Sequence, residues 1–597
     1  MSRMILLALV VVGCGNSEPV EPEHPSADPP PSWGVPLTGG TMLVTRDGRR
    51  AVISDPDRDR IATVDLASGQ VVADIALTAG DEPGRLVEDG AGRIHVALRR
   101  GGALVTVPDP ASGQGLVRRP VCSEPRGVAY DPVTDQLHVA CTGGELVSFA
   151  ASGGDATRRL QLDRDLRDVV VSGTDLIVTR FRTAEVLTID AHGAVVDRAA
   201  PPIVKRPGTS VGFDGPSPPL PQPPLVDAVP AVAWRTIALP DGRMLMTHQR
   251  QIKSPLGMMQ GGYGGGCGTG LVESAITVVQ PGSAPVAVAP FVNGALPIDI
   301  AVTRSMDAIA AISAGSKLVT IAYPTALSAL DTDGCSRGDS PIAFSDELGT
   351  PSSVAFASSG ALLVYYPEVP ALVVRSSVAP GATATTIMLP GELGYDSGRA
   401  LFHTQTNLGI ACASCHPEGR DDGLVWDFAE IGLRRTQSLA GHILRRAPYH
   451  WGADMADLDQ LMDDVFSNRM AGGLISRSAR RSLGPWLDRI PAPVATPIDP
   501  AASARGKQLF ESAELACTTC HAGELLTNNQ RFDVSTGGTF KVPSLLGVGA
   551  RAPYLHDGCA ATLADRFGPC GGGDLHGHTS ALTAPQLADL IAYLEAI

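Results

Sequence analysis

"IHVAL", residues 94–98, is followed by a near copy, "LHVAC", at residues 137–141. Related apolar runs are AVIS, LIVTR, MLMTH, IAAIS and LLVYY, which begin at residues 51, 176, 244, 309 and 362. The first four starts recur about every 40 residues, a period typical of β-propeller blades. Seven starts therefore predict an all-β, seven-bladed β-propeller over residues 36–392. The alternative is a pair of β-sandwiches, which would not naturally keep this period.

The composition agrees with many short strands in a chain of several domains. A length of 597 residues exceeds what one core usually organises, and Gly (66) and Pro (48) are abundant, as tight turns require. The wider gaps between runs coincide with Gly- and Pro-rich insertions at residues 201–225 and 257–270. His248 lies just before the second insertion and is interpreted as structural, with a role in a neighbouring site as the alternative.

The N-terminus indicates export. "MSRMILLALVVVGC" places Arg3 before an apolar run that is too short to span a bilayer, so residues 1–13 are predicted to be a signal peptide. The residues around Cys14 resemble a bacterial lipobox, which implies lipidation of Cys14 and a Pro-rich tether over residues 14–35. We expect a lipid-anchored protein of the periplasm or outer membrane surface. An ordinary signal peptide and a soluble periplasmic protein are the alternative.

Two pentapeptides in the last third of the chain carry the chemistry. "CASCH" (412–416) and "CTTCH" (517–521) both follow the C-x-x-C-H pattern of c-type haem attachment. In this pattern the two thiols bond the haem and the histidine ligates its iron. The motifs predict two covalent haems c, attached at Cys412, Cys415, Cys517 and Cys520, with His416 and His521 as metal ligands. A redox dithiol or a zinc site is disfavoured because both copies carry the histidine.

The surroundings of the two motifs are repeated as well. "SGRALF" (397–402) and "RGKQLF" (505–510) precede them, and "RAPY" follows at Arg446 and Arg551, equally far from each histidine. The repetition predicts two small, mainly α-helical cytochrome c modules, residues 393–490 and 491–597. The fold class is therefore multidomain, with the propeller first.

The remaining cysteines suggest disulfides. Without Cys14 and the four motif cysteines, six of the eleven are left, an even number in an oxidising compartment. Six cysteines allow about 15 connectivities. We expect the pairs Cys122–Cys141, Cys267–Cys335 and Cys559–Cys570.

The last third, about residues 393–597, resembles the di-haem cytochrome c peroxidase family, which includes the MauG-type enzymes. The two motifs, their lead segments and "FKVPSLLGVGARAPYLHDGCAATL" (540–563) carry the resemblance. It implies an oxidoreductase in which one haem accepts electrons from a small donor, such as a c-type cytochrome or a cupredoxin. The other haem reacts with hydrogen peroxide or another oxidant. Trp451 falls where the family has a tryptophan between the haems, with simple packing as the alternative.

The sixth ligands of the two irons decide the activity. Met470 is the candidate for the first iron, with His442 and His450 as weaker candidates and a core methionine as the alternative. No methionine follows Met470. The second iron is therefore expected to take His576 or His578, or to stay open. The family often holds Ca²⁺ between its haems, but no acidic loop of calcium-binding spacing occurs here.

One departure bears on peroxidase activity. Arg469 stands where the family carries an acidic residue, and a guanidinium cannot move protons at O–O cleavage. Glu430, Asp422 and Asp427 are weak substitutes, and we single out Glu430 and Trp451 as catalytic candidates. An electron relay without peroxidase activity and a surface protein that binds partners through its propeller remain open. A formal charge of −15 argues against a nucleic-acid partner and suits a soluble surface or a basic redox protein.

Overall fold

A computed structural model describes residues 37–208, 224–265, 270–290, 294–332, 342–494 and 499–597. Cys14, the predicted signal peptide and the predicted tether lie outside the described residues, as do Cys267 and Cys335. Within the described part of the chain, no helix is both long and apolar enough to span a membrane.

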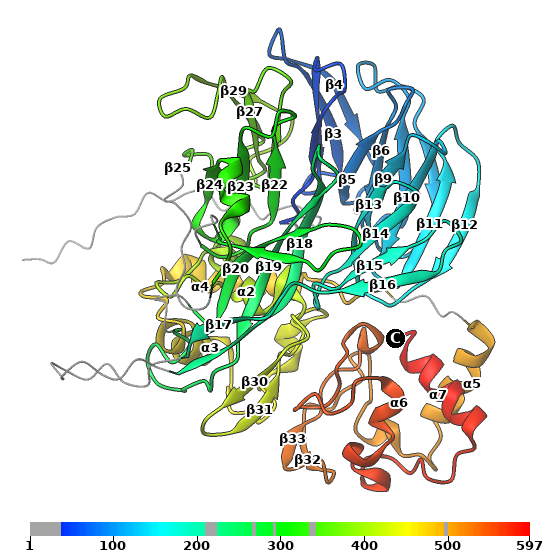
Figure 1. The fold of residues 1–597 in the computed structure, drawn as a ribbon. Helices are drawn as coiled ribbons and strands as arrows, with labels where there is room; N and C mark the ends of the chain where they lie inside the picture. The colour runs from blue at the N-terminus through cyan, green and yellow to red at the C-terminus, as the bar shows by residue number, and fades with distance from the viewer. Residues whose placement is uncertain (1–36, 209–223, 266–269, 291–293, 333–341, 495–498) are drawn as a thin grey trace, which may run out of the picture.

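Seven antiparallel sheets stand around one axis and form a seven-bladed β-propeller (Figure 1). Every sheet consists of strands that follow one another in the chain, and the ring closes where β1 packs beside β26. Blades one to four comprise β1 (Met42–Val44), β2 (Arg50–Asp55), β3 (Arg60–Asp65), β4 (Gln70–Ala76); β5 (Pro83–Glu88), β6 (Ile94–Leu98), β7 (Ala103–Val107), β8 (Val117–Pro120); β9 (Pro125–Asp131), β10 (Gln136–Cys141), β11 (Glu145–Ala150), β12 (Ala156–Gln161); and β13 (Leu166–Ser172), β14 (Asp175–Arg180), β15 (Val186–Ile189), β16 (Val195–Ala199).

Blade five has five strands and the last two blades have four each. They comprise β17 (Val204–Pro207), β18 (Leu225–Ala238), β19 (Met244–Ile252), β20 (Val272–Val279), β21 (Val286–Val288); β22 (Asp299–Val302), β23 (Ile309–Ser313), β24 (Leu318–Ala322), β25 (Ile342–Phe344); and β26 (Ser353–Phe356), β27 (Leu362–Tyr366), β28 (Ala371–Arg375), β29 (Ala384–Met388).

The predicted seven blades are confirmed. Six of the apolar runs lie in the second strand of their blade, and MLMTH lies in β19, the third strand of the five-stranded blade. β6, β23 and β27 are buried along their whole length because neighbouring blades cover both of their faces. A strand covered on both faces is apolar at every position rather than at alternate ones. The sequence analysis took each run as the start of its unit. In the structure another strand precedes it, and several of these preceding strands are joined to one another by ion pairs, such as that of Arg235 with Asp168 at 3.2 Å and with Asp299 at 3.4 Å.

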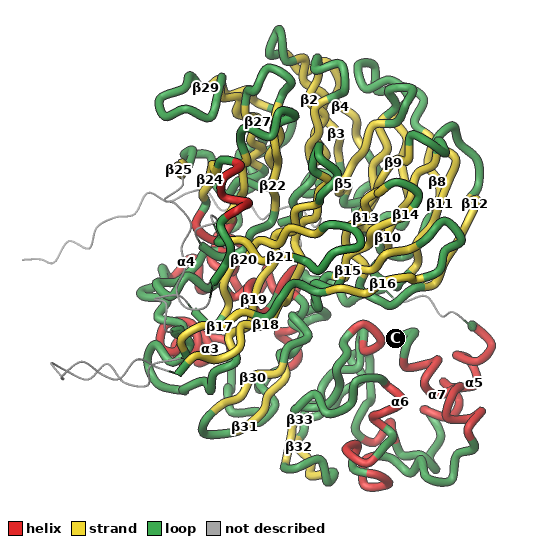
Figure 2. The backbone as a smooth tube through the Cα atoms, viewed as in Figure 1, coloured by secondary structure: helices red, strands yellow, loops and turns green. Residues whose placement is uncertain are grey.

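The last third of the chain lies against one face of the propeller and contains short helices and two hairpins (Figure 2). Around the first motif these are α1 (Ser397–His403), α2 (Cys412–Cys415), β30 (Val425–Phe428), β31 (Gly432–Arg435), α3 (Leu458–Leu461), a π-helical stretch (Met462–Arg469) and α4 (Arg477–Asp488). Around the second motif they are α5 (Pro500–Phe510), β32 (Arg531–Asp533), β33 (Thr539–Lys541), α6 (Leu563–Arg566) and α7 (Ala584–Leu594). Short 3₁₀ turns complete the set: Ala314–Ser316, Pro324–Ser328, Pro417–Gly419, Ile443–Arg446, Cys517–Thr519, Val548–Ala550, Pro569–Gly571 and Gly573–His576.

The repeated lead segments fold alike. α1 packs on α4 and α5 packs on α7, and in each pair a glycine lies at the crossing. A Cβ added to Gly398 would meet the Ser482 carbonyl oxygen at 2.5 Å, and one added to Gly506 would meet that of Asp589 at 1.9 Å. The shared glycine of "SGRALF" and "RGKQLF" therefore serves the close approach of two helix backbones.

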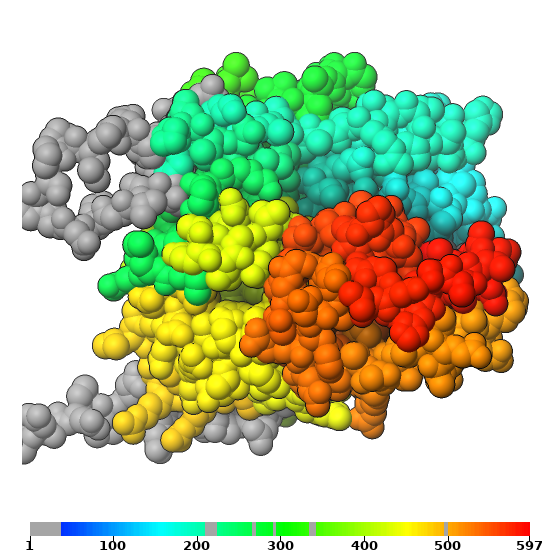
Figure 3. Space-filling view, turned by 90° about the horizontal axis from the view of Figure 1, so that it is seen from below, coloured from blue at the N-terminus to red at the C-terminus, as the bar shows by residue number. Residues whose placement is uncertain are grey.

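The two halves of this last third are buried differently. Side chains around the first motif belong to one apolar core with propeller residues such as Phe181 and Trp234. The second half has a core of its own: Phe510, Leu515, Val548, Leu563, Leu590, Tyr593 and Leu594. Seen from below, the two halves lie side by side against the propeller (Figure 3).

The structure forms the disulfides Cys122–Cys141 and Cys559–Cys570, as the sequence predicts. Among the described residues, the one group of three possible metal ligands joins Glu145 to the first of these disulfides, whose sulfurs are already bonded to each other.

Candidate functional site

Both pentapeptide motifs open into one cavity of about 1110 Å³ between the two halves of the last third. All six predicted haem-binding residues line it: Cys412, Cys415, His416, Cys517, Cys520 and His521. The volume exceeds the roughly 300–1,000 Å³ of pockets for drug-sized ligands, so the cavity is large for one small molecule. Its size and donors suit two macrocycles with an iron each.

Each motif presents a neutral imidazole to this cavity. The Nδ1 atom of His416 lies 3.2 Å from the Arg420 carbonyl oxygen, and that of His521 lies 3.0 Å from the Leu526 carbonyl oxygen. Burial lowers the pKa of both histidines, to about 4 for His521. An imidazole that donates its Nδ1 proton to a carbonyl keeps Nε2 free for a metal, which is how metal-binding histidines are usually oriented.

Four buried or half-buried cations provide a second test of the fit. Arg446, Lys541, Arg551 and Arg566 line the cavity. Within the described part of the chain, the hydrogen bonds of these four side chains go to backbone carbonyls and none has a carboxylate partner. Burial lowers the pKa of Lys541 to about 8 and those of the three arginines to about 10.

Buried charges without partners are costly, so this arrangement calls for anions in the cavity. Two haems bring four propionate carboxylates, which suit four such cations. The repeat extends to this detail: Arg446 donates to the Leu439 carbonyl and Arg551 to the Ser544 carbonyl, each seven residues earlier. The residues present therefore fit a pair of haems.

On the second half, the structure brings one predicted sixth ligand into position. The ring centre of His576 lies 6.4 Å from that of His521, and both side chains line the cavity. Two imidazoles that share one metal ion at ~2 Å from each Nε2 have their ring centres roughly 6 Å apart. The Nδ1 atom of His576 lies 3.1 Å from the Gly571 carbonyl oxygen, the same arrangement as at His521. His578 also lines the cavity but is exposed.

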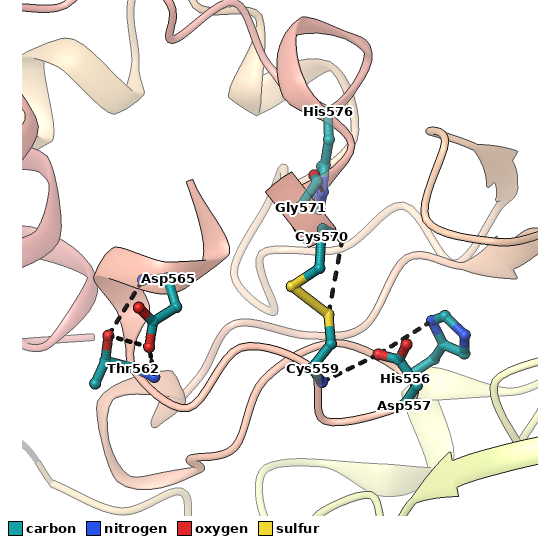
Figure 4. Close-up of a disulfide and its surroundings, with 8 residues drawn as sticks. All are labelled: His556, Asp557, Cys559, Thr562, Asp565, Cys570, Gly571 and His576. Atoms are coloured by element: carbon teal, nitrogen blue, oxygen red, sulfur yellow. Dashed lines mark hydrogen bonds and ion pairs between the residues drawn. A yellow bond between two sulfur atoms is a disulfide. The ribbon is translucent and has the colours of Figure 1, made fainter. Parts of the chain in front are cut away.

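A disulfide holds the loop that carries His576. Cys559 is bonded to Cys570, and Gly571, which receives the His576 hydrogen bond, follows directly (Figure 4). The loop is rich in glycine and packs tightly: a Cβ at Gly572 would meet the Val534 carbonyl oxygen at 1.9 Å. The covalent link compensates for a flexible loop sequence, and its role near the site was not anticipated from the sequence.

Around the first motif, several predicted and unpredicted groups share the cavity. Met470 is buried and lines it, as do His450 and Arg469. His442 does not line it, and its Nδ1 atom lies 3.8 Å from Asp488 at the surface. Tyr263, from the Gly-rich insertion between β19 and β20, also reaches the cavity. Tyr263 was not predicted as a site residue, although it is the single aromatic residue of this Gly-rich insertion.

The insertion is fixed to the first half by backbone hydrogen bonds. The Gly261 N–H donates to the Asn468 carbonyl (2.9 Å) and the Tyr263 N–H to that of Arg469 (3.1 Å). Burial raises the pKa of Tyr263, and the adjacent Arg469 opposes that shift. The Nε atom of Arg469 is buried and, within the described chain, has no hydrogen-bond partner. A phenol and a guanidinium therefore offer donors on this side of the cavity.

Trp451 lies between the two halves. Its Nε1–H donates to the Arg435 carbonyl (2.8 Å), and its own carbonyl accepts from the N–H of Lys541 (2.8 Å). Its ring centre is 6.4 Å from that of His556, which stacks on Phe540 at 3.9 Å. The sequence pointed to Trp451 but not to His556 or Phe540, which extend the aromatic contact into the second half.

The acidic candidates do not face the cavity. Glu430 lies at the tip of the β30–β31 hairpin, where its carboxylate accepts from the Met258 N–H (3.3 Å), and Asp427 is exposed. Asp422 is buried, and burial raises its pKa to about 7, but it does not line the cavity. His248 is buried with both ring nitrogens engaged, by the Gln249 carbonyl and the Thr277 hydroxyl, as a structural histidine would be.

Comparisons with known proteins agree with part of this picture. No family model matches the chain. Hydrazine synthase subunit gamma from Kuenenia stuttgartiensis is 27% identical, over 31% of this chain and 72% of that protein.

Among solved structures, Kuenenia stuttgartiensis hydrazine synthase matches with a TM-score of 0.45 and 15% identity, over 60% of this chain and 96% of that one. A virginiamycin B lyase from Staphylococcus aureus matches with a TM-score of 0.39 and 10% identity, over 56% of this chain and 94% of that one. Both scores are low, so the assignment of seven blades rests on the strand pairing described above.

Proposed function

We propose that the protein is a di-haem c-type cytochrome oxidoreductase that passes electrons between an external donor and a small oxidant. The observation that carries this proposal is the single cavity lined by both C-x-x-C-H motifs and by four unpaired cations. Haem, when bound there, supplies one-electron chemistry and an iron that can activate a small ligand. The chain supplies attachment, iron ligands and the surrounding charge.

The two halves are suited to different tasks. His576 opposite His521 favours a closed second iron, which exchanges electrons but takes no further ligand. The first half is then the site for the oxidant, where Tyr263 and Arg469 can donate hydrogen bonds to a bound small molecule. Trp451, with His556, lies on the path between them. Reduction of hydrogen peroxide to two water molecules takes two electrons and two protons, so two one-electron centres suit it.

Met470 favours a second candidate function. It is buried and lines the cavity on the first half, where a thioether on the first iron would close that site too. Both irons would then be six-coordinate and the protein would relay electrons without reacting with an oxidant. The similarity to a subunit of hydrazine synthase favours an enzyme over a relay or a pure binding protein, and adds small nitrogen compounds to peroxide as substrates to test.

Export, lipid attachment at Cys14 and a basic redox partner remain parts of the proposal that rest on the sequence. The face of the propeller that meets the last third is covered by it (Figure 1). A partner that binds the propeller would therefore have to use another face.

Low-temperature EPR of the holoprotein, fully oxidised and then half-reduced, tests the proposed function. A high-spin ferric signal that disappears on adding peroxide or hydroxylamine supports an oxidoreductase with one open iron. Two low-spin signals that neither compound changes would show the relay. Absence of covalent haem on both motifs, measured by mass spectrometry, would overturn both functions.

A further inference from the structure

The segment that follows His416 is inserted among the inner strands of the propeller. Glu418, two residues after this histidine, is buried and has a left-handed backbone conformation (φ +54°). Its carboxylate accepts from Arg99 at 2.9 Å and Arg167 at 2.8 Å, and lies 3.3 Å from Arg126. Blades two, three and four each supply one of these arginines. Three guanidinium groups from three blades thus surround one carboxylate next to a predicted iron ligand.

Neighbouring residues of the same segment are held in the same way. Arg420 pairs with Glu124 of blade three, with N···O distances of 2.5 and 2.9 Å. Asp421 pairs with Arg182 at 3.1 Å. The Gln249 side chain of blade five donates to the Ser414 carbonyl inside the motif itself at 2.7 Å. From Ser414 to Asp421 the chain is therefore anchored to four blades, the second to the fifth.

Among the residues that the structure describes, the second motif has no equivalent of this arrangement. His521 is followed by Ala522, Gly523 and Glu524. The Glu524 side chain is 80% exposed and pairs with Arg445 at 3.0 Å on the surface. Exposed pairs of this kind contribute little, because water screens their charges. The buried cluster is therefore a property of the first motif alone.

The buried charges of the cluster act on one another at close range. Burial alone would raise the pKa of Glu418, but Arg126, Arg99 and Arg167 hold it well below its usual range. Burial would also raise the pKa of Glu124, but Arg420 and Arg126 lower it to about 2. Both carboxylates are ionised at neutral pH. In a water-poor environment such charges also act on a nearby iron, whose oxidised form carries one more positive charge.

We propose that Glu418 is a positioning residue through which the propeller fixes the proximal side of the first haem and sets its reduction potential. This inference rests on the proposed haem attachment. It gives the propeller a definite role, because charged side chains from several blades surround the segment that follows His416. The residues that follow His521 lie outside this cluster.

The test measures the midpoint potential of each haem in the full-length holoprotein, by spectroelectrochemical titration with EPR to assign the two signals. Glu418→Gln removes a negative charge and is expected to raise the potential of the first haem without moving that of the second. Arg167→Gln is expected to lower it, and the double variant to return near the wild type. Glu524→Gln is the matched control and is expected to change neither potential.

If Glu418 only holds the segment in place, the reduction potentials of the variants should shift differently. Loosening the segment would admit water, which stabilises the oxidised iron and lowers the potential in both single variants. A fall in Glu418→Gln, or no shift at all, would overturn the inference. If Glu418→Gln does not fold, Glu124→Gln removes a negative charge from the propeller side and is expected to raise the same potential. Lack of haem on the wild-type motif would instead refute the proposed function.

Discussion

CASCH and CTTCH share their spacing but not their setting. Ser414, inside the first, is 2% exposed, and the Pro417–Gly419 segment after it is buried among propeller strands. Thr519, inside the second, is exposed, and so are Gly523 and Glu524 after it. The first motif shares its apolar core with the propeller, whereas the second has a small core of its own. Two identical attachment patterns can therefore differ in stability and potential through their surroundings alone.

The largest difference is expected when the attachment cysteines are removed. Cys412→Ala/Cys415→Ala and Cys517→Ala/Cys520→Ala should each reduce the haem count from two to one. The first pair should also lower the melting temperature of the propeller, because it leaves a void in the shared core. Mass spectrometry counts the haems, and circular dichroism follows the strands on heating. Equal melting of both variants would show that the two settings do not differ in stability.

His576→Ala should have the next largest effect, and it should be confined to the second haem. Loss of the imidazole opposite His521 leaves the iron without its sixth ligand, so a low-spin signal should become high-spin. His578→Ala, two residues on and exposed, is the control. EPR of both variants distinguishes the two histidines. A second haem that stays low-spin in His576→Ala would mean that another residue binds the iron.

The propeller and the two motifs could be predicted from the sequence, but the way in which the propeller meets the last third could not. The propeller was predictable because the strands that contain the seven runs are covered on both faces and are therefore mostly apolar, as in "IHVAL", where His95 is the one polar residue. The two C-x-x-C-H motifs could be recognised because covalent haem attachment fixes this spacing, and haem attachment at them stays a prediction.

Glu418 and Tyr263 were not predictable as site residues. Glu418 looks like an ordinary polar residue after a haem motif, and Tyr263 is about 150 positions before the motif it faces. Their roles depend on how the propeller meets the last third, which no local pattern encodes.

Acid should selectively destabilise the surroundings of the first motif. Glu124 has its pKa lowered to about 2 from an ordinary 4.5, so the folded state favours its charged form. Its contribution to the free energy of unfolding is complete above about pH 4.5 and is lost as the pH falls from about 4.5 through about 2. The shift corresponds to roughly 3 kcal/mol. Unfolding by urea should show a steeper loss of stability across this window in the wild type than in Glu124→Gln. Parallel curves would show that the buried pair with Arg420 does not stabilise the first half.

The disulfide Cys559–Cys570 should have the smallest effect, and only on the second haem. Cys559→Ser/Cys570→Ser frees a glycine-rich loop, whose many conformations compete with the one that places His576 opposite His521. In a fraction of the molecules the second haem should then become high-spin, and this fraction should be smaller than in His576→Ala. It should grow on warming, because the conformational entropy of the loop favours release of His576 from the iron. The first haem, anchored through Glu418, should keep its spectrum. A second haem that stays fully low-spin at every temperature would show that packing alone holds His576, as at the close contact of Gly572 with Val534.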